Sequence, residues 1–177
     1  MCAWGTKSEI PFPTPGWQND TNFASILYYS DNEGASWRMA GAPIETTNEC
    51  TFSLLPDKRL LFLGRAQSVP LSYVIFDANL SNHTPLRRVQ GVPSPVCEGS
   101  LVSGHPQGPG SGHVFFSNPS STHWRGNLSI HSSVDGVHWD RGFEVWGAAN
   151  HQVSGCANFF LGRWLQKYCY FIGSSRL

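Results

Sequence analysis

Apolar residues recur along the chain in short runs that are separated by turn-forming residues. Clear examples are segments 23–30, 49–66, 71–78 and 113–116. Runs of this length bounded by Gly, Pro, Asn and Asp are typical of β-strands. No segment shows the sustained period of an amphipathic helix. The pattern therefore predicts an all-β chain built from many short strands.

The connections between these runs are short, which favours hairpins. Segment 49–66 reads as two strands with a turn at Pro56-Asp57 between them. Further strand-like runs occur around Leu101, at 126–133 and at 142–147, and two more close the chain within 157–173. The order of the runs predicts a meander, in which each strand pairs with the next.

One polar turn appears twice. Residues 29–38 (YSDNEGASWR) follow a strand-like run, and residues 131–142 (HSSVDGVHWDRG) follow another. In this alignment Ser30 and Trp37 match Ser132 and Trp139, seven positions apart in each copy. Ser, Asn and Asp side chains bond to nearby backbone in turns. We therefore expect side-chain-stabilised turns whose tryptophans pack back onto the sheet.

The distance between the two copies indicates the architecture. The tryptophans are 102 positions apart, which is two periods of about 50 residues, and β-rich repeats of that length are typical of propeller blades. A middle copy would fall at 72–84, where a strand and a polar turn occur without tryptophan. The chain is predicted to form about three blades.

Composition narrows the classes of partner. Only 14% of the 177 residues are charged, and the charges balance to zero, so neither nucleic acid nor an acidic membrane surface is indicated. No apolar run reaches the ~18 residues of a membrane span, and residues 1–10 do not resemble a signal peptide. Four glycosylation sequons favour the lysosomal or extracellular side; they begin at Asn19, Asn79, Asn82 and Asn127.

The five cysteines show no metal-binding spacing. They are Cys2, Cys50, Cys97, Cys156 and Cys169. Because the count is odd and no CxxC occurs, we expect buried free thiols and no bound metal.

Several motifs together resemble one family. Residues 30–37 match the Asp-box turn, with Asn32 in place of Asp and Ser36 in place of Thr. "NEC…LLPDKRLLFLGRAQS", "CEGSL" and "VFFSNPSSTHWRGNLSIHSSVDGVHW" follow in the order of sialidase segments. The chain thus resembles exo-α-sialidases of the cellular type, which implies a six-bladed β-propeller. Residues 1–177 would form part of that domain, with 1–22 as a loop or extended lead-in, 23–147 as the best-matched region and 148–177 as a divergent end.

The resemblance implies roles for individual residues. Arg65 and Arg125 would be the second and third of the three arginines that bind the substrate carboxylate. Glu49 would remove the proton from a nucleophilic tyrosine, and Glu98 would face the sugar. The tyrosine would be Tyr170, although Tyr168 or neither residue also fits its spacing. The first arginine and the Asp that acts as general acid have no counterpart in the matched segments.

These roles imply a retaining exo-α-sialidase-like glycoside hydrolase, without cofactor, that removes terminal sialic acid from glycoproteins, glycolipids or oligosaccharides. One alternative is a non-catalytic sialoside-binding module on a shortened propeller. Another is an Asp-box propeller without any link to sugars, in which Glu49, Arg65 and Arg125 would lie far apart. Open blade edges would also permit self-association.

Overall fold

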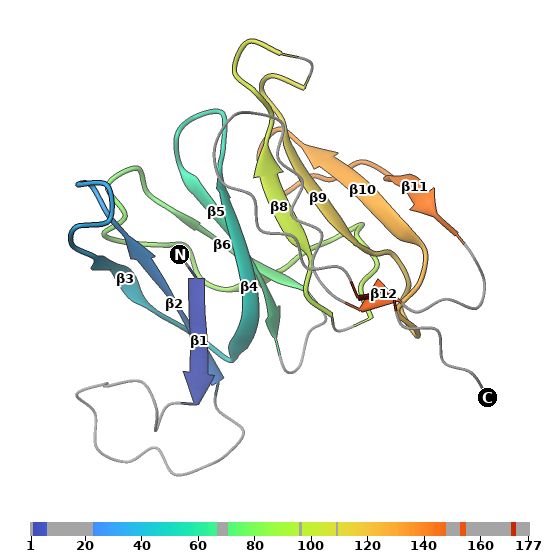
Figure 1. Ribbon diagram of the computed structural model, residues 1–177, viewed down its shortest axis with the longest axis horizontal. Helices are drawn as coiled ribbons and strands as arrows, with labels where there is room; N and C mark the ends of the chain where they lie inside the picture. The colour runs from blue at the N-terminus through green and yellow to red at the C-terminus, as the bar shows by residue number, and fades with distance from the viewer. Residues whose placement is uncertain are drawn as a thin grey trace.

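The computed structural model of the chain describes residues 23–66, 71–95, 97–108 and 110–147, and the backbone of 2–6, 153–154 and 171–172. Every regular element in these ranges is a β-strand, and the strands form separate antiparallel sheets (Figure 1). The predicted all-β class is confirmed. Within the same ranges no helix has the length and apolar character needed to cross a membrane.

Three sheets lie side by side, and we call them blades 1, 2 and 3. Blade 1 contains β1 (Cys2–Thr6), β2 (Phe23–Tyr29) and β3 (Arg38–Glu45). Blade 2 contains β4 (Thr47–Leu54), β5 (Leu60–Ala66), β6 (Ser72–Phe76) and β7 (Arg87–Arg88). Blade 3 contains β8 (Ser100–Ser103), β9 (Val114–Pro119), β10 (Leu128–Ser133) and β11 (Phe143–Trp146). A separate pair consists of β12 (Val153–Ser154) and β13 (Phe171–Ile172).

Each blade is a meander, as the short connections predicted, because strands that are neighbours in sequence are also neighbours in the sheet. β1 and β2 lie against β4, and β4 lies against β8. The blades therefore follow one another around a common axis, as in part of a β-propeller. β1 falls within the expected lead-in of residues 1–22, and it pairs with β2 from Cys2↔Leu27 to Thr6↔Phe23.

The central position of blade 2 explains its apolar strands. Side chains alternate between the faces of a strand, so the continuous run of β5 buries both faces. Leu61 and Leu63 join the core between blades 2 and 3, whereas Leu60 and Phe62 join the core between blades 1 and 2. All four side chains are buried. Packing on both sides thus holds the three blades together.

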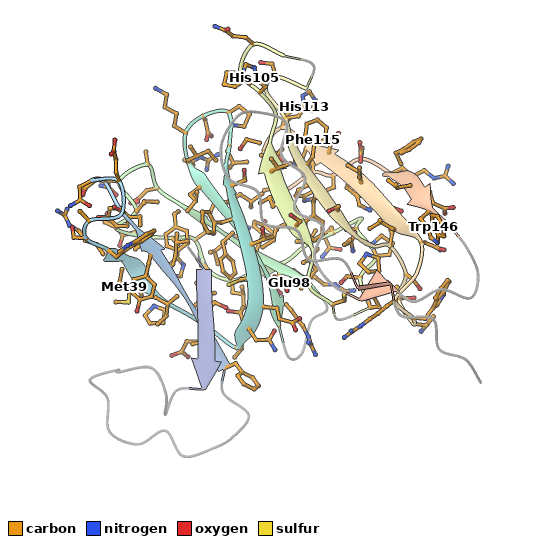
Figure 2. All side chains as sticks on the ribbon, viewed as in Figure 1. Met39, Glu98, His105, His113, Phe115 and Trp146 are labelled. Carbon is orange, nitrogen blue, oxygen red and sulfur yellow. The ribbon has the colours of Figure 1, made fainter. Side chains whose placement is uncertain are left out.

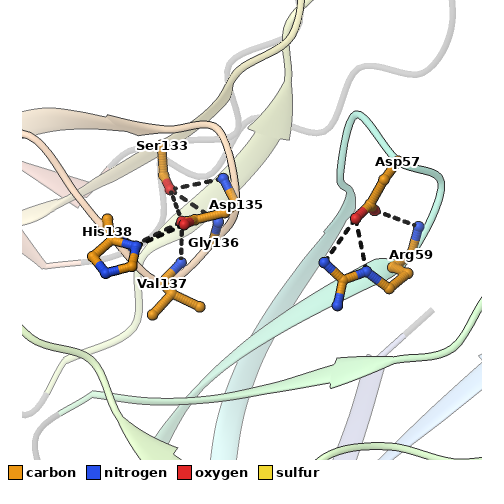
Figure 3. A network of polar contacts seen from close by, with 7 residues as sticks. All are labelled: Asp57, Arg59, Ser133, Asp135, Gly136, Val137 and His138. Carbon is orange, nitrogen blue, oxygen red and sulfur yellow. Dashed lines mark hydrogen bonds and ion pairs between the residues drawn. The ribbon is translucent and has the colours of Figure 1, made fainter.

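The polar turn of blade 3 is a network of side-chain-to-backbone hydrogen bonds (Figure 3). The Ser133 hydroxyl accepts hydrogen bonds from the backbone N–H of Asp135 at 3.3 Å and of Gly136 at 2.9 Å. The Asp135 carboxylate accepts from the N–H groups of Val137 and His138, both at 2.8 Å. The alignment on Ser132 is therefore wrong by one position. Ser132 instead donates its hydroxyl proton to Asp140, 2.7 Å away.

The corresponding turn of blade 1 uses the residues that the motif indicated. The Ser30 hydroxyl accepts from the N–H of Gly34 at 2.7 Å, and the Asn32 side-chain oxygen accepts from the N–H of Ser36 at 2.8 Å. In blade 2 the turn between β6 and β7 has neither this serine nor a tryptophan. There the Asp77 carboxylate accepts from the N–H of Ser81 at 2.9 Å. The three turns occupy the same place, directly before the last strand of each blade.

The two tryptophans of these turns differ in burial. Trp139 packs against the core between blades 2 and 3, with its ring 6.0 Å from that of Phe116. Trp37 is 50% exposed, so the expectation that it packs onto the sheet is wrong. The reason is positional: Trp139 faces the preceding blade, and no described blade precedes Trp37.

The β4–β5 hairpin turns at Pro56-Asp57 as predicted. The Arg59 guanidinium donates from Nε to Asp57 at 2.8 Å, and this contact lies beside the Asp135 network in Figure 3. That hydrogen bond holds the pKa of Asp57 below its ordinary value. The two cysteines whose side chains the structure describes differ in state. Cys97 is a buried free thiol, but Cys50 is disulfide-bonded.

The Asp135 turn predicts a pH dependence of stability. Desolvation opposes ionisation of Asp135, but the hydrogen bonds from His138, Val137 and Ser133 outweigh it and hold the pKa of this carboxyl well below its usual range. A lowered folded-state pKa gives stability that is present above the unfolded value of about 3.9 and is lost as the pH falls. We expect Asp135→Asn to reduce the fall in Tm between about pH 5 and pH 2.

Thermal unfolding followed by circular dichroism across that range measures this effect. Asp31→Asn is the matched control, because Asp31 also lies in a polar turn but makes one exposed ion pair, with Arg38 at 3.3 Å. An unchanged pH profile for Asp135→Asn would contradict the stabilising role of the ionised carboxylate.

Candidate active site

Four candidate residues lie at one end of blades 2 and 3. Glu49 is near the start of β4 and Arg65 near the end of β5, while Glu98 lies two residues before the start of β8. Arg125 is in the connection from β9 to β10. β4 and β8 run away from this end, and β5 and β9 run toward it. Figure 2 shows Glu98 at the opposite end of blade 3 from His105 and His113. The Asp-box turns also lie at that opposite end.

Glu49 and Arg65 form an ion pair across the first hairpin of blade 2. Nη1 of Arg65 donates to Oε2 of Glu49 at 3.1 Å, and both side chains are less than one-third exposed. The register of β4 against β5 shifts between Thr47 and Cys50. Such bulges redirect a side chain and are common beside active sites. This bulge contains Glu49.

The backbone around the bulge is fixed from blade 1. The Ser25 hydroxyl donates to the carbonyl of Asn48 at 2.7 Å. The Thr47 hydroxyl donates to the carbonyl of Ile44, also at 2.7 Å. Ser25 and Thr47 are both fully buried. The position of Glu49 therefore depends on the contact between blades 1 and 2.

Glu98 is positioned by contacts between blades 2 and 3. The N–H of Leu101, in β8, donates to the hydroxyl of Thr51 in β4 at 3.2 Å. The segment that precedes Glu98 is fixed by Asn118, whose buried amide donates to the carbonyl of Pro93 at 2.8 Å. The FSNP motif thus has a structural role, because its asparagine anchors the segment that leads to Glu98.

A shallow dip that is open to solvent lies between the two blades at this point, and it encloses no space for a water molecule. Its polar lining includes Glu49, Arg65 and Glu98, and Leu63 and Phe116 contribute apolar surface. Cys97 also lines the dip and is 4% exposed. Glu49, Arg65 and Glu98 therefore line one shallow dip, and Arg125 is not among its lining residues.

All four charged candidates affect the pKa of the buried Cys97 thiol. Burial raises the pKa of the Cys97 thiol, Arg125 and Arg65 lower it, and Glu49 and Glu98 raise it further. All four charges are thus close enough to act on one buried sulfur atom. The contact between Glu49 and Arg65 disagrees with the alternative in which these two residues lie far apart.

Arg125 differs from Arg65 in its partners. Its side chain is partly buried, and no carboxylate within the described ranges lies at ion-pair distance from it. A planar guanidinium in this state can bind a carboxylate through two parallel hydrogen bonds. Among the residues that the structure describes, the site thus contains one arginine in an ion pair and one without an ion-pair partner.

Three further points concern the nucleophilic tyrosine, a metal site and Cys97. Tyr170 and Tyr168 lie outside the described residues, so the nucleophile stays a prediction. Side chains in the described ranges form no group of three or more His, Cys, Asp or Glu that could hold a metal ion. Sequence reasoning missed the central place of Cys97, although the CEGS motif that identified Glu98 contains it.

Solved structures with a similar fold were found among sialidases. A Hadza microbial sialidase matches with a TM-score of 0.64 and 20% identity, over 78% of this chain and 28% of that one. NanB sialidase from Streptococcus pneumoniae gives 0.59 and 14%, over 76% and 21%. Trypanosoma rangeli sialidase gives 0.54 and 16%, over 75% and 22%. The chain has part of the sialidase propeller fold.

The sialidase fold accounts for the meander blades and their order. The chain spans between one-fifth and one-third of the length of these sialidases. No protein-family model and no curated protein matches the sequence. The fold is therefore established by structural similarity, and the chemistry of the site has to be argued from its own residues.

Proposed function

We propose that this chain carries the carboxylate-binding part of an exo-α-sialidase-like glycoside hydrolase. The observation that supports this most is the Glu49–Arg65 ion pair, which lines the same shallow dip as Glu98, with the charge of Arg125 near enough to act on the pKa of Cys97 in that lining. Within a sialidase-type fold, these side chains would together form a charged site at one end of the blades. Its ligand would be the terminal sialic acid of a glycoprotein, glycolipid or oligosaccharide.

The arginines would bind the carboxylate of the sugar. Arg125 would accept it first, because its guanidinium has no ion-pair partner in the described part of the chain. Arg65 would contribute a second contact while it remains bonded to Glu49, 3.1 Å away. Arginine suits this role because its fork of N–H groups matches the two oxygens of a carboxylate.

Glu49 would serve as the base. Sialidases use a tyrosine nucleophile, and an unperturbed tyrosine, with a pKa of about 10, needs a neighbouring base to attack near neutral pH. Arg65 orients the Glu49 carboxylate for this task. In the proposed reaction the tyrosine, Tyr170 in our assignment, attacks the anomeric carbon while the glycosidic bond breaks and the leaving oxygen takes a proton from a general acid that the matched segments do not contain. Water then hydrolyses the glycosyl-enzyme intermediate with retention of configuration.

A binding module without catalysis is the second candidate. It is favoured by one observation: neither the first arginine nor the Asp acid has a counterpart in the matched segments. Two arginines and Glu98 would still hold a sialoside. Binding and turnover therefore have to be measured separately.

Comparing sialic acid with its methyl ester tests the proposed site directly. The ester keeps the shape of the sugar but removes the charge that the arginines would bind. We expect the acid to bind at least about tenfold more tightly than the ester, because hydrogen bonds to a charged group contribute about 1.5–3 kcal/mol. Calorimetry or ligand-observed NMR at constant salt measures both affinities.

Hydrolysis of a fluorogenic sialoside separates the two candidates. Turnover that Glu49→Gln abolishes would support the hydrolase, whereas binding of the acid without turnover would support the binding module. Equal affinity for acid and ester, or no binding by a folded chain, would contradict both.

A further inference from the structure

The loop that carries Arg125 is closed at its base by two hydrogen bonds to one carbonyl. This loop, residues 120–127, connects β9 to β10. The carbonyl of Asn127 accepts from the N–H of Ser120 at 2.9 Å and from the hydroxyl of Ser129 at 3.0 Å. Asn127 also has a positive φ of 57°, which is uncommon for a residue other than glycine. Both ends of the loop are therefore fixed to the β9–β10 hairpin.

Arg125 is the central residue of a tight turn within this loop. The N–H of Gly126 donates to the carbonyl of Trp124 at 3.0 Å, and a hydrogen bond between residues two positions apart closes a γ-turn. The turn fixes the direction in which the Arg125 side chain leaves the backbone. Burial raises the pKa of the Cys97 thiol and the charge of Arg125 opposes that rise. The turn thus places the guanidinium near the dip that Cys97 lines.

The ring of Trp124 lies directly on Gly126. A Cβ at Gly126 would overlap three carbon atoms of the six-membered ring of Trp124. Gly126 is buried, and its φ is not positive, so its backbone conformation is open to other residues. Glycine is therefore required at this position to make room for the tryptophan ring.

The packed ring stabilises the γ-turn in two ways. It lies against a buried residue, so water has little access to the N–H that closes the turn, and a hydrogen bond is stronger where the local dielectric is low. It also fills space that the flexible backbone of Gly126 would otherwise use. Without the ring, Arg125 would be followed by an unrestrained glycine and would lose its fixed orientation.

We propose that Trp124 is a positioning residue for the carboxylate site. By packing on Gly126 it holds the γ-turn and keeps Arg125 oriented toward the carboxylate of a bound sialic acid. Less conformational freedom is then lost when the ligand binds. Trp124 acts through Arg125 and needs no contact with the sugar. This inference rests on the proposed function, because it explains how Arg125 is held ready for its ligand.

The affinities of sialic acid and its methyl ester separate positioning from a general structural role. Trp124→Ala and Gly126→Ala should each weaken binding of the acid at least about fivefold and leave binding of the ester nearly unchanged, because only the acid offers the charge that Arg125 binds. Trp124→Phe keeps a planar ring and should restore most of the affinity for the acid. In the Arg125→Ala background, Trp124→Ala should cause no further loss. His123→Ala is the matched control, because His123 is exposed in the same loop.

Limited digestion with trypsin tests the turn without any ligand. Trypsin cleaves after arginine, and cleavage after Arg125 requires the turn to open. Trp124→Ala should be cut at this bond at least about fivefold faster than the wild type, because proteolysis follows the population of the open state. His123→Ala should be cut as the wild type is, and cleavage after the exposed Arg88 should be the same in all variants. Circular dichroism confirms that each variant is folded.

The outcomes distinguish this inference from the proposed function. If the wild type does not prefer the acid to the ester, the proposed carboxylate site is wrong, and the digestion still tests the turn. If Arg125→Ala removes the preference and Trp124→Ala keeps it, the positioning role is wrong. An equal loss of acid and ester binding in Trp124→Ala, or unchanged cleavage after Arg125, would overturn that role as well.

Discussion

Leu61→Ala is expected to lower the free energy of unfolding by about 2–5 kcal/mol. Leu61 is fully buried on β5 and packs in the core between blades 2 and 3. It also lies under the Asp-box turn of blade 3, next to Gly136. The substitution therefore leaves a cavity between two blades, where surrounding strands that pair on both sides have little freedom to collapse.

Urea unfolding followed by fluorescence measures the loss, and an unchanged m-value would show that the unfolded states are comparable. Leu54→Ala is the matched control, because Leu54 is 54% exposed on the neighbouring strand β4. It should change stability by no more than about 0.5 kcal/mol. Equal losses for both variants would mean that the core between blades 2 and 3 is not what stabilises the chain.

The second large effect concerns ligand affinity. Arg125→Ala is expected to weaken binding of sialic acid by about 10–100-fold, because a charge-assisted hydrogen-bonded contact contributes about 1.5–3 kcal/mol. Arg125→Lys should restore only part of this loss, since an ammonium group keeps the charge but cannot form the planar two-bond contact. Affinity for the methyl ester should change little in either variant.

Calorimetric titration with sialic acid provides the measurement. Arg88→Ala is the control, because Arg88 is an exposed arginine on β7, the last strand of blade 2. It should bind sialic acid as the wild type does. If Arg125→Ala also bound normally while remaining folded, the carboxylate site would have to lie elsewhere.

The fold could be predicted where local patterns decide it. The run of β5 is apolar throughout because both of its faces are buried, and short turns between such runs indicate a meander. The two Asp-box copies could not be aligned correctly from spacing alone. Ser132 and Ser133 are adjacent, and only the direction of each side chain shows that Ser133 bonds to the turn.

The sequence pattern alone indicated only some of the candidate site residues. Glu49 and Arg65 meet because one hairpin joins their strands, which the sequence pattern already indicated. Glu98 and Arg125 are brought to the same place by contacts between blades, and the resemblance to sialidase segments identified them. The exposure of Trp37 and the disulfide state of Cys50 depend on packing between distant segments, which no local pattern contains.

The separation of the two ends of the blades has a consequence for how such a chain can change over evolutionary time. The turns that keep the blades in shape lie at one end, and the loops that carry the charged residues lie at the other. Substitutions in the Arg125 loop therefore leave the Asp-box networks intact. Residues at one end can diverge while those at the other maintain the scaffold, which is consistent with a shared fold at 14–20% identity.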